Sequence, residues 1–271
     1  MRKLLLILII SFEIFANERV ISLSPAITEI LFALNRGEDV VAVSKFSNYP
    51  KEAQKLPIVG GSISIDIEKI LALNPTLVVA QQFQKSFAQK LQKLGVKVLF
   101  VKLNTIANIE ESILFLGKHL KAKKEAKELI DSIKRAKKMA KHSKKKKRVL
   151  IVFTLKESLK NGIYVSGKKL FYDEILEICG DTNAFSNPDV AQPVLNYENI
   201  IALNPDTVLI LHSKASNPYV DEKKAILAWL SLPIEASKKR DIHIIKDEYI
   251  FIPSQRIALT IERICKELRL K

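Results

Sequence analysis

One phrase occurs twice in this chain, about 130 residues apart. Residues 66–75 read DIEKILALNP and residues 196–205 read NYENIIALNP, and an apolar run follows each copy. Each copy predicts a short helix, a stop at the proline and a buried strand. Two copies of one helix–strand unit predict two lobes of like construction, and proteins of this kind usually bind something between their lobes.

The rest of the chain alternates between strand-like and helix-like segments, which predicts an α/β fold with parallel-rich sheets flanked by helices. Ser24-Pro25 is a typical helix start, since serine caps and proline suits the first helical position. Beside the two repeats, we expect helices at 25–34, 87–94, 109–120, 171–178 and 258–268. We expect strands at 19–23, 40–43, 57–61, 77–80, 96–101, 149–153, 208–211, 242–245 and 249–252.

The first sixteen residues have the pattern of a secretory signal. Arg2 and Lys3 precede an unbroken apolar run over 4–10, and Ala16 is a suitable residue before the cleavage point. The apolar run is too short to span a bilayer. We therefore expect export with cleavage of residues 1–16 and a soluble mature protein.

A basic segment divides the remaining chain. Residues 121–148 hold 14 Lys and Arg against three acids, and account for most of the net charge of +15. The absence of proline and glycine from 122–142 predicts one long helix over 121–147, joining an N-terminal lobe, 17–120, to a C-terminal lobe, 148–271. With no interleaved aromatic residues, we interpret the segment as a solvated helix face rather than a nucleic-acid site. Weak attraction to anionic lipid headgroups is a possible side effect.

The motifs of common enzymes are absent from the sequence. The four histidines form no metal-binding pair, and there is no Cys-x-x-Cys, P-loop, glycine-rich dinucleotide turn or Gly-x-Ser-x-Gly elbow. We therefore expect no catalytic residues, no metal site and no cofactor. The two cysteines, Cys179 and Cys265, indicate a disulfide in an exported protein, and two buried thiols are the alternative.

Glu68 and Glu198 hold the same place in the two repeats. In the first turn of a helix a carboxylate is stabilised by the helix dipole, by about 0.3–1 kcal/mol, which is one explanation for both. The other is that they form two exposed anionic posts, one on each lobe, which dock onto arginines of a partner.

Several stretches together resemble one family, in matching order and spacing. These are RVISLSPAITE at 19–29, SNYP at 47–50, the two repeats, SGK at 166–168 and LEICG at 176–180. They resemble the helical-backbone (class III) substrate-binding proteins of ABC importers, which take vitamin B12, ferric siderophores or haem. The resemblance covers residues 19–268. It implies two α/β lobes joined by one rigid helix, and a periplasmic monomer that delivers its ligand to a permease dimer in the inner membrane. Glu68 and Glu198 fall at the permease-docking positions of this family.

The members that bind vitamin B12 share further details with this chain. Cys179 and Cys265 match two of their cysteines, which implies that the two are bonded, and Tyr49 matches an aromatic residue of their cleft. Polar residues near 62–64 and at 81 and 192 stand where those members have tryptophans, and Gly61 stands where haem-binding members have a ligating tyrosine, which disfavours haem. The expected cleft residues are Tyr49, Gln81, Phe83, Tyr164, Gln192 and Arg256.

The expected ligand is cobalamin or a related corrinoid, with a ferric siderophore or another iron chelate as the alternative. The residues leave two other classes open. One is an exported enzyme on the same scaffold, which would need clustered Cys or His ligands. The other is a basic surface-binding module, which would be retained on anionic surfaces in a salt-sensitive way.

Overall fold

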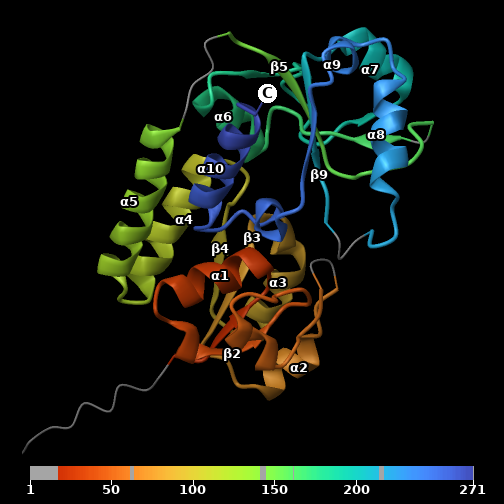
Figure 1. The fold of residues 1–271 in the computed structure, drawn as a ribbon. Coiled ribbons are helices and arrows are strands. Elements are labelled where there is room, and N and C mark those ends of the chain that lie inside the picture. Colours follow the sequence, from red (N-terminus) through yellow and green to blue (C-terminus); the bar gives the residue numbers. More distant parts are fainter. Residues whose placement is uncertain (1–17, 62–63, 141–144, 161, 214–216, 271) are drawn as a thin grey trace, which may run out of the picture.

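The computed structural model describes residues 18–61, 64–140, 145–160, 162–213 and 217–270. The expected signal peptide, 1–16, lies outside these residues. The described chain forms two α/β lobes, one below the other in Figure 1, with helices α4 (Ile106–His119) and α5 (Lys123–Met139) along one side.

The first lobe is built on a sheet of four parallel strands. These are β1 (Val20–Ser22), β2 (Val40–Val43), β3 (Leu77–Gln81) and β4 (Val98–Val101), in the order β2-β1-β3-β4. Its helices are α1 (Pro25–Ala33), α2 (Ile67–Ala72) and α3 (Lys85–Lys93). Helix α1 starts as the sequence predicts, because the Ser24 hydroxyl accepts from the Ile27 amide at 3.2 Å and Pro25 takes the first helical position.

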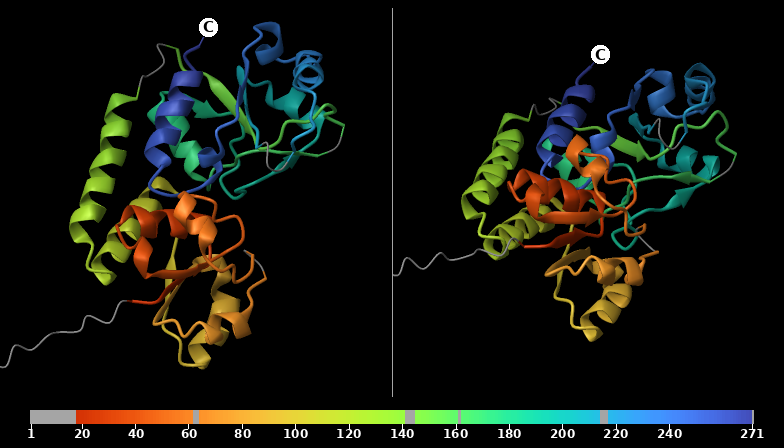
Figure 2. Two further views of the ribbon diagram at one scale, coloured as in Figure 1. Left: turned by 60° about the horizontal axis from the view of Figure 1, so that its bottom comes forward. Right: turned by 90° about the horizontal axis from the view of Figure 1, so that it is seen from below.

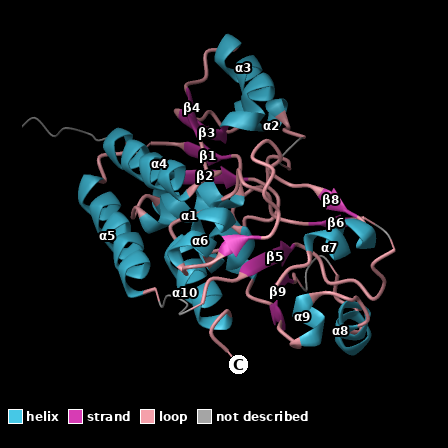
Figure 3. Cartoon of the chain, turned by 90° about the horizontal axis from the view of Figure 1, so that it is seen from above, coloured by secondary structure: helices cyan, strands magenta, loops and turns pink. Residues whose placement is uncertain are grey.

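The second lobe repeats this topology. Its sheet has β5 (Arg148–Val152), β7 (Thr182–Asn183), β9 (Thr207–Leu211) and β10 (Ile242–Ile245), all parallel and in the order β7-β5-β9-β10. If the strands of each sheet are numbered along the chain, both sheets have the same spatial order, 2-1-3-4. A short antiparallel pair is added, β6 (Ile163–Tyr164) with β8 (Val194–Leu195). The helices are α6 (Phe171–Ile178), α7 (Tyr197–Leu203), α8 (Glu222–Leu230), α9 (Glu235–Lys238) and α10 (Ile257–Glu267). Figure 3 shows helices on both faces of the sheets. The prediction of two like α/β lobes is confirmed.

The repeated phrase has the same structure in both lobes. It forms α2 and β3 in the first lobe, and α7 and β9 in the second. An Asx side chain caps each helix, Asp66 in one and Asn196 in the other. Each helix is followed by an asparagine in the left-handed region, with φ of 44° at Asn74 and 43° at Asn204. Asparagine tolerates this conformation, and the next residue is proline, so each helix ends at the same place.

The lobes are connected by a pair of helices. The chain turns back at residues 120–122, between α4 and α5, and α5 packs along both α4 and α10 (Figures 1 and 2). Helix α5 corresponds to the helix expected over 121–147, but it ends at Met139, and residues 141–144 lie outside the described chain. The expected helices at 109–120 and 121–147 thus appear as the neighbouring helices α4 and α5, and the second is shorter than expected.

One apolar core runs through both lobes. It includes Ile30 of α1, Ile113 of α4, Ile133 of α5, Ile175 of α6 and Ile261 of α10, all fully buried. Interiors of this kind are close-packed and resist deformation. The helical layer therefore ties the two lobes together, and a stiff connection of this kind favours only a small movement of the lobes on ligand binding.

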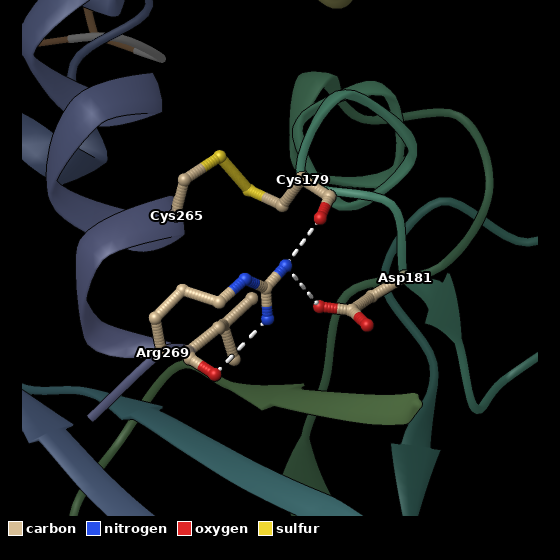
Figure 4. The surroundings of a disulfide bond; sticks show 5 residues. Cys179, Asp181, Cys265 and Arg269 are labelled. Atoms are coloured by element: carbon tan, nitrogen blue, oxygen red, sulfur yellow. Dashed lines mark hydrogen bonds and ion pairs between the residues drawn. A yellow bond between two sulfur atoms is a disulfide. The ribbon is translucent and has the colours of Figure 1, made fainter. Parts of the chain in front are cut away.

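Cys179 and Cys265 form a disulfide between the end of α6 and α10 (Figure 4), as the resemblance implied. Next to it, the Arg269 guanidinium donates to the carbonyl oxygen of Cys179 and to the carboxylate of Asp181. The bond closes a loop of 86 residues within the second lobe.

Two expected strands are wrong. Residues 249–252 are a continuous apolar run, YIFI, but Glu248–Phe251 is a 3-10 helix two residues after β10. There Ile250 is buried, while Tyr249 and Phe251 are half-buried, so the apolar residues close the end of the sheet instead of extending it. Residues 57–61 make only isolated bridges, Val43 with Ile58 and Gly60 with Ile65.

A network of charged residues lies at the edge of the second sheet. The His243 Nε2 is 2.7 Å from Asp241 Oδ1, and its Nδ1 is 3.2 Å from Glu267 Oε1. Asp241 also accepts from Lys147 and Thr207. Burial opposes ionisation of Asp241, but hydrogen bonds from His243, Lys147 and Thr207 outweigh it and lower its pKa to about 2. The hydrogen bond to Asp241 raises the pKa of His243, against the effect of its partial burial.

The raised pKa of His243 gives a pH-dependent contribution to stability. A group whose pKa is higher in the folded state stabilises fully below its unfolded pKa, and this stabilisation is lost as the pH rises through the folded pKa. We therefore expect the free energy of unfolding to fall as the pH is raised from about 6 through the folded-state pKa of His243. His243→Gln should flatten this fall in urea titrations, and His119→Gln, at an exposed histidine of α4, should not. An unchanged pH profile in His243→Gln would contradict the assignment.

Candidate ligand-binding cleft

The candidate site is a cleft between the lobes, at the carboxyl ends of the parallel strands. Residues that line it lie in the segments that follow β2, β3, β4, β5, β9 and β10. In open α/β sheets this is the end at which ligands bind, because loops from several strands converge there. Here two such ends contribute to one cleft.

The cleft has a volume of about 1290 Å³. Pockets for drug-sized molecules usually have about 300–1,000 Å³, so this one fits a bulky ligand. Eight aromatic residues line it: Phe46, Tyr49, Phe83, Phe153, Tyr164, Phe171, Tyr172 and Phe251. The uncharged polar residues of the lining are Asn48, Gln81, Asn104, Thr154, Gln192 and Ser213.

All six residues expected from the sequence line this cleft. Gln81 ends β3 and Phe83 follows it, Tyr164 lies on β6, and Gln192 lies just before β8. Tyr49 follows β2, and Arg256 immediately precedes α10. Their position is therefore settled, and contact with a ligand stays a prediction.

The cleft is more aromatic than the sequence predicts. Polar residues do stand at the expected tryptophan positions, and the chain's tryptophan, Trp229, is fully buried in the core of the second lobe. The aromatic surface of the cleft comes instead from other segments, and includes Phe46, Phe153 and Phe251. The missed signal was the phenylalanine just before the SNYP motif, together with Phe153 directly after β5 and Phe251 in the 3-10 helix that follows β10.

Phe46 has an unusual conformation for an aromatic residue. Its φ is 69°, and 68% of its side chain is exposed although it lines the cleft. A bulky residue in this region of φ costs about 1–3 kcal/mol, and persists only where its surroundings fix it. The Ser47 hydroxyl is 3.1 Å from the Ser44 hydroxyl in the same loop and 3.1 Å from the Thr28 hydroxyl on α1, and all three residues are buried. They hold the loop that presents Phe46 and Tyr49 to the cleft.

Three charged residues are found among the described residues of the lining, Glu29, Glu248 and Arg256. Arg256 donates from Nε to Glu29 Oε2 at 2.8 Å and from Nη2 to Glu29 Oε1. The Glu248 carboxylate accepts from the Ser213 hydroxyl at 2.8 Å. The one cation of this set is thus paired with a carboxylate, which was not visible in the sequence because the two residues lie 227 positions apart.

Tyr172 forms part of the cleft wall. Its hydroxyl donates to the carbonyl oxygen of Ile250 at 2.7 Å, and its side chain is buried. Burial raises the pKa of Tyr172 far above its usual range. The phenol therefore stays neutral, and adds no charge to the cleft.

Glu68 and Glu198 lie outside the cleft. Each is the second residue of its helix, α2 or α7, and each is exposed. Helix α2 lies at the outer end of the first lobe and α7 at the outer end of the second, both away from α5 (Figure 1). The two carboxylates are thus presented in the same way on the two lobes.

Neither a metal site nor a membrane span is found in the described part of the chain. Those residues contain no group of three or more His, Cys, Asp or Glu that could hold a metal ion. They also contain no helix that is long and apolar enough to cross a bilayer.

Two like lobes, a large cleft between them and a stiff helical connection define a substrate-binding protein of the two-lobed type. Residues 20–245 match the family model described as periplasmic binding protein, and the chain belongs to this family. Over 211 residues it is 34% identical to the vitamin B12-binding protein of Salmonella paratyphi A, and this aligned region covers 76% of each of the two chains.

Solved structures show the same fold. A possible iron-binding, periplasmic solute-binding protein from Staphylococcus epidermidis matches with a TM-score of 0.75 and 27% identity, over 94% of this chain and 100% of the other. The periplasmic haem-binding protein of Vibrio cholerae matches with a TM-score of 0.80, over 94% of this chain and 100% of the other. At 21% identity, the second likeness concerns the fold alone.

Proposed function

We propose that this chain is the periplasmic substrate-binding protein of an ABC importer, and that its ligand is cobalamin or a related corrinoid. The observation that carries the proposal is the cleft itself, which is large, lined by eight aromatic residues, and nearly balanced in charge. The similarity to a vitamin B12-binding protein supports it. The ligand is carried without chemical change, and residues 1–16 direct export.

The charges of the cleft favour a neutral ligand. The Arg256 charge is paired with Glu29, which leaves the Glu248 carboxylate as the remaining charge among the described residues of the lining. An anionic ligand would meet this carboxylate without an unpaired cation to balance it. The amide groups of a corrinoid are neutral, and Asn48, Gln81, Asn104 and Gln192 offer matching hydrogen-bond partners.

A ferric siderophore or another iron chelate is the second candidate. The possible iron-binding protein from Staphylococcus epidermidis, with 27% identity, supports it. To bind an anionic chelate, the Arg256 guanidinium would have to leave Glu29, because it is otherwise paired with that carboxylate. The paired state of Arg256 therefore favours the corrinoid.

A thermal-shift screen tests the proposal. A ligand that binds the folded state alone raises the melting temperature by mass action. We expect cyanocobalamin to raise it in a dose-dependent way, and ferric siderophores and haemin to leave it unchanged. A shift with a ferric chelate and none with cyanocobalamin would assign the protein to the iron carriers.

Phe46→Ala is expected to weaken corrinoid binding by about ten- to a hundredfold. Burying a phenylalanine side chain contributes about 1.5–3 kcal/mol, and each 1.4 kcal/mol is a factor of ten in Kd. Fluorescence or calorimetric titration measures the change. Tyr219→Ala is the control, because Tyr219 is 94% exposed and lies outside the cleft lining. Equal affinities in both variants would remove Phe46 from the binding surface.

A further inference from the structure

Arg256 lies where the two lobes meet. It precedes α10 of the second lobe, and its guanidinium donates twice to the carboxylate of Glu29, on α1 of the first lobe. The Ser254 hydroxyl donates to the same carboxylate. Glu29 is only 3% exposed, and Ser254 is fully buried. A two-pronged arginine–carboxylate pair fixes both groups in one geometry, and here its location is the wall of the cleft.

The same guanidinium also holds an aromatic ring. Its Cζ is 4.1 Å from the centre of the Tyr49 ring, which is the range of a cation–π contact. About half of the Tyr49 side chain is exposed, and this residue lines the cleft. Arg256 thus contacts Glu29 and the Tyr49 ring at the same time, within the lining of the cleft.

We propose that Glu29 sets the charge selectivity of the cleft, by cancelling the positive charge of Arg256, and that the paired Arg256 is a positioning residue for Tyr49. The inference rests on the proposed function for the class of ligand, and adds the residues by which anionic ligands are rejected. Glu29 is buried, so it acts through Arg256. Arginine without this partner would be an anion-binding group in an aromatic cleft.

The test uses two ligands that share one macrocycle and differ in the charge of their side chains. Dicyanocobinamide carries neutral amides, and dicyanocobyrinic acid carries carboxylates. The ratio of their dissociation constants is measured by titration for the wild type, Glu29→Gln and the double variant Glu29→Gln/Arg256→Met. Circular dichroism and thermal melting establish that each variant is folded.

Glu29→Gln keeps the shape of the side chain and leaves the guanidinium charge uncancelled. We expect the ratio to shift at least tenfold toward the carboxylate ligand, and the double variant to return it to within about threefold of the wild type. A merely structural role for Glu29 would weaken both ligands alike. A ratio in Glu29→Gln that stays within threefold of the wild type overturns the proposal.

The double variant is a test even if Glu29→Gln alone does not fold. If Glu29 cancels the charge of Arg256 in the wild type, replacing both residues leaves the ratio of the two dissociation constants unchanged. A shift of tenfold or more away from the carboxylate ligand would show that the Arg256 charge already acts on ligands, and would overturn the proposal.

Failure of the proposed function gives a different result. A wild type that binds neither corrinoid contradicts the corrinoid assignment. Titration with haemin, an anionic tetrapyrrole, then tests the inference by itself. At least tenfold tighter binding to Glu29→Gln than to the double variant supports it, and equal binding overturns it.

Discussion

Reversing the charge of both lobe-end glutamates, Glu68→Lys with Glu198→Lys, is expected to abolish uptake and to leave ligand affinity as it was. Both residues are exposed, both are the second residue of a short helix, and neither lines the cleft. If they dock onto arginines of a permease dimer, two lysines there replace attraction with repulsion at both ends. Uptake of labelled ligand by cells that also express the partner permease measures the effect, and titration of the purified variant measures affinity.

The matched control is Glu111→Lys with Glu128→Lys. Both residues are exposed glutamates on the connecting helices α4 and α5, and the change in net charge is the same. We expect uptake to drop at least tenfold in the lobe-end variant, and to stay near wild type in the control. Loss of ligand affinity in the lobe-end variant would instead place these glutamates in ligand binding.

Removing the disulfide, with Cys179→Ala and Cys265→Ala, is expected to lower the free energy of unfolding by about 2–5 kcal/mol. The bond closes a loop of 86 residues, and a loop of this length strongly restricts the unfolded chain. Alanine suits the site because both side chains are buried among apolar residues. Urea unfolding of the variant, beside wild type with and without reductant, measures the change.

The reduced wild type serves as the second measurement, since it has the same side chains and lacks the bond. We expect it to unfold near the midpoint of the double variant. A loss below 1 kcal/mol in both would mean that the packing of α6 against α10 holds this part of the lobe without the bond.

The two lobes were predictable from the sequence because each copy of the repeat contains its own signals for the start and the end of a helix. Asp66 and Asn196 cap their helices, and Asn74 and Asn204 with the prolines after them end those helices, in both copies. Signals of this kind act within a few residues, so they survive without knowledge of the tertiary structure. The segment at 249–252 was mistaken for a strand for the complementary reason. Its apolar residues lie in a 3-10 helix, and a short continuous apolar run does not distinguish that from a further strand.

The position of the cleft residues was predictable, and their partners were not. Tyr49, Gln81 and Gln192 lie in segments that adjoin strands, so the expected topology carries them to the cleft. The pairing of Arg256 with Glu29 joins residues 227 positions apart, and no local pattern encodes it. The sequence therefore predicted Arg256 as a cleft residue but not its partner, and the observed geometry favours a role in positioning Tyr49.

Calorimetric titration of the mature protein, from Asn17 onward, with cyanocobalamin and with a panel of ferric siderophores tests the central claim most directly. We expect one corrinoid to bind per chain with a sub-micromolar Kd, and no heat of binding from the ferric chelates. Tight binding of a ferric siderophore with none of cyanocobalamin would contradict the account. It would show that the Arg256–Glu29 pair opens for an anionic ligand.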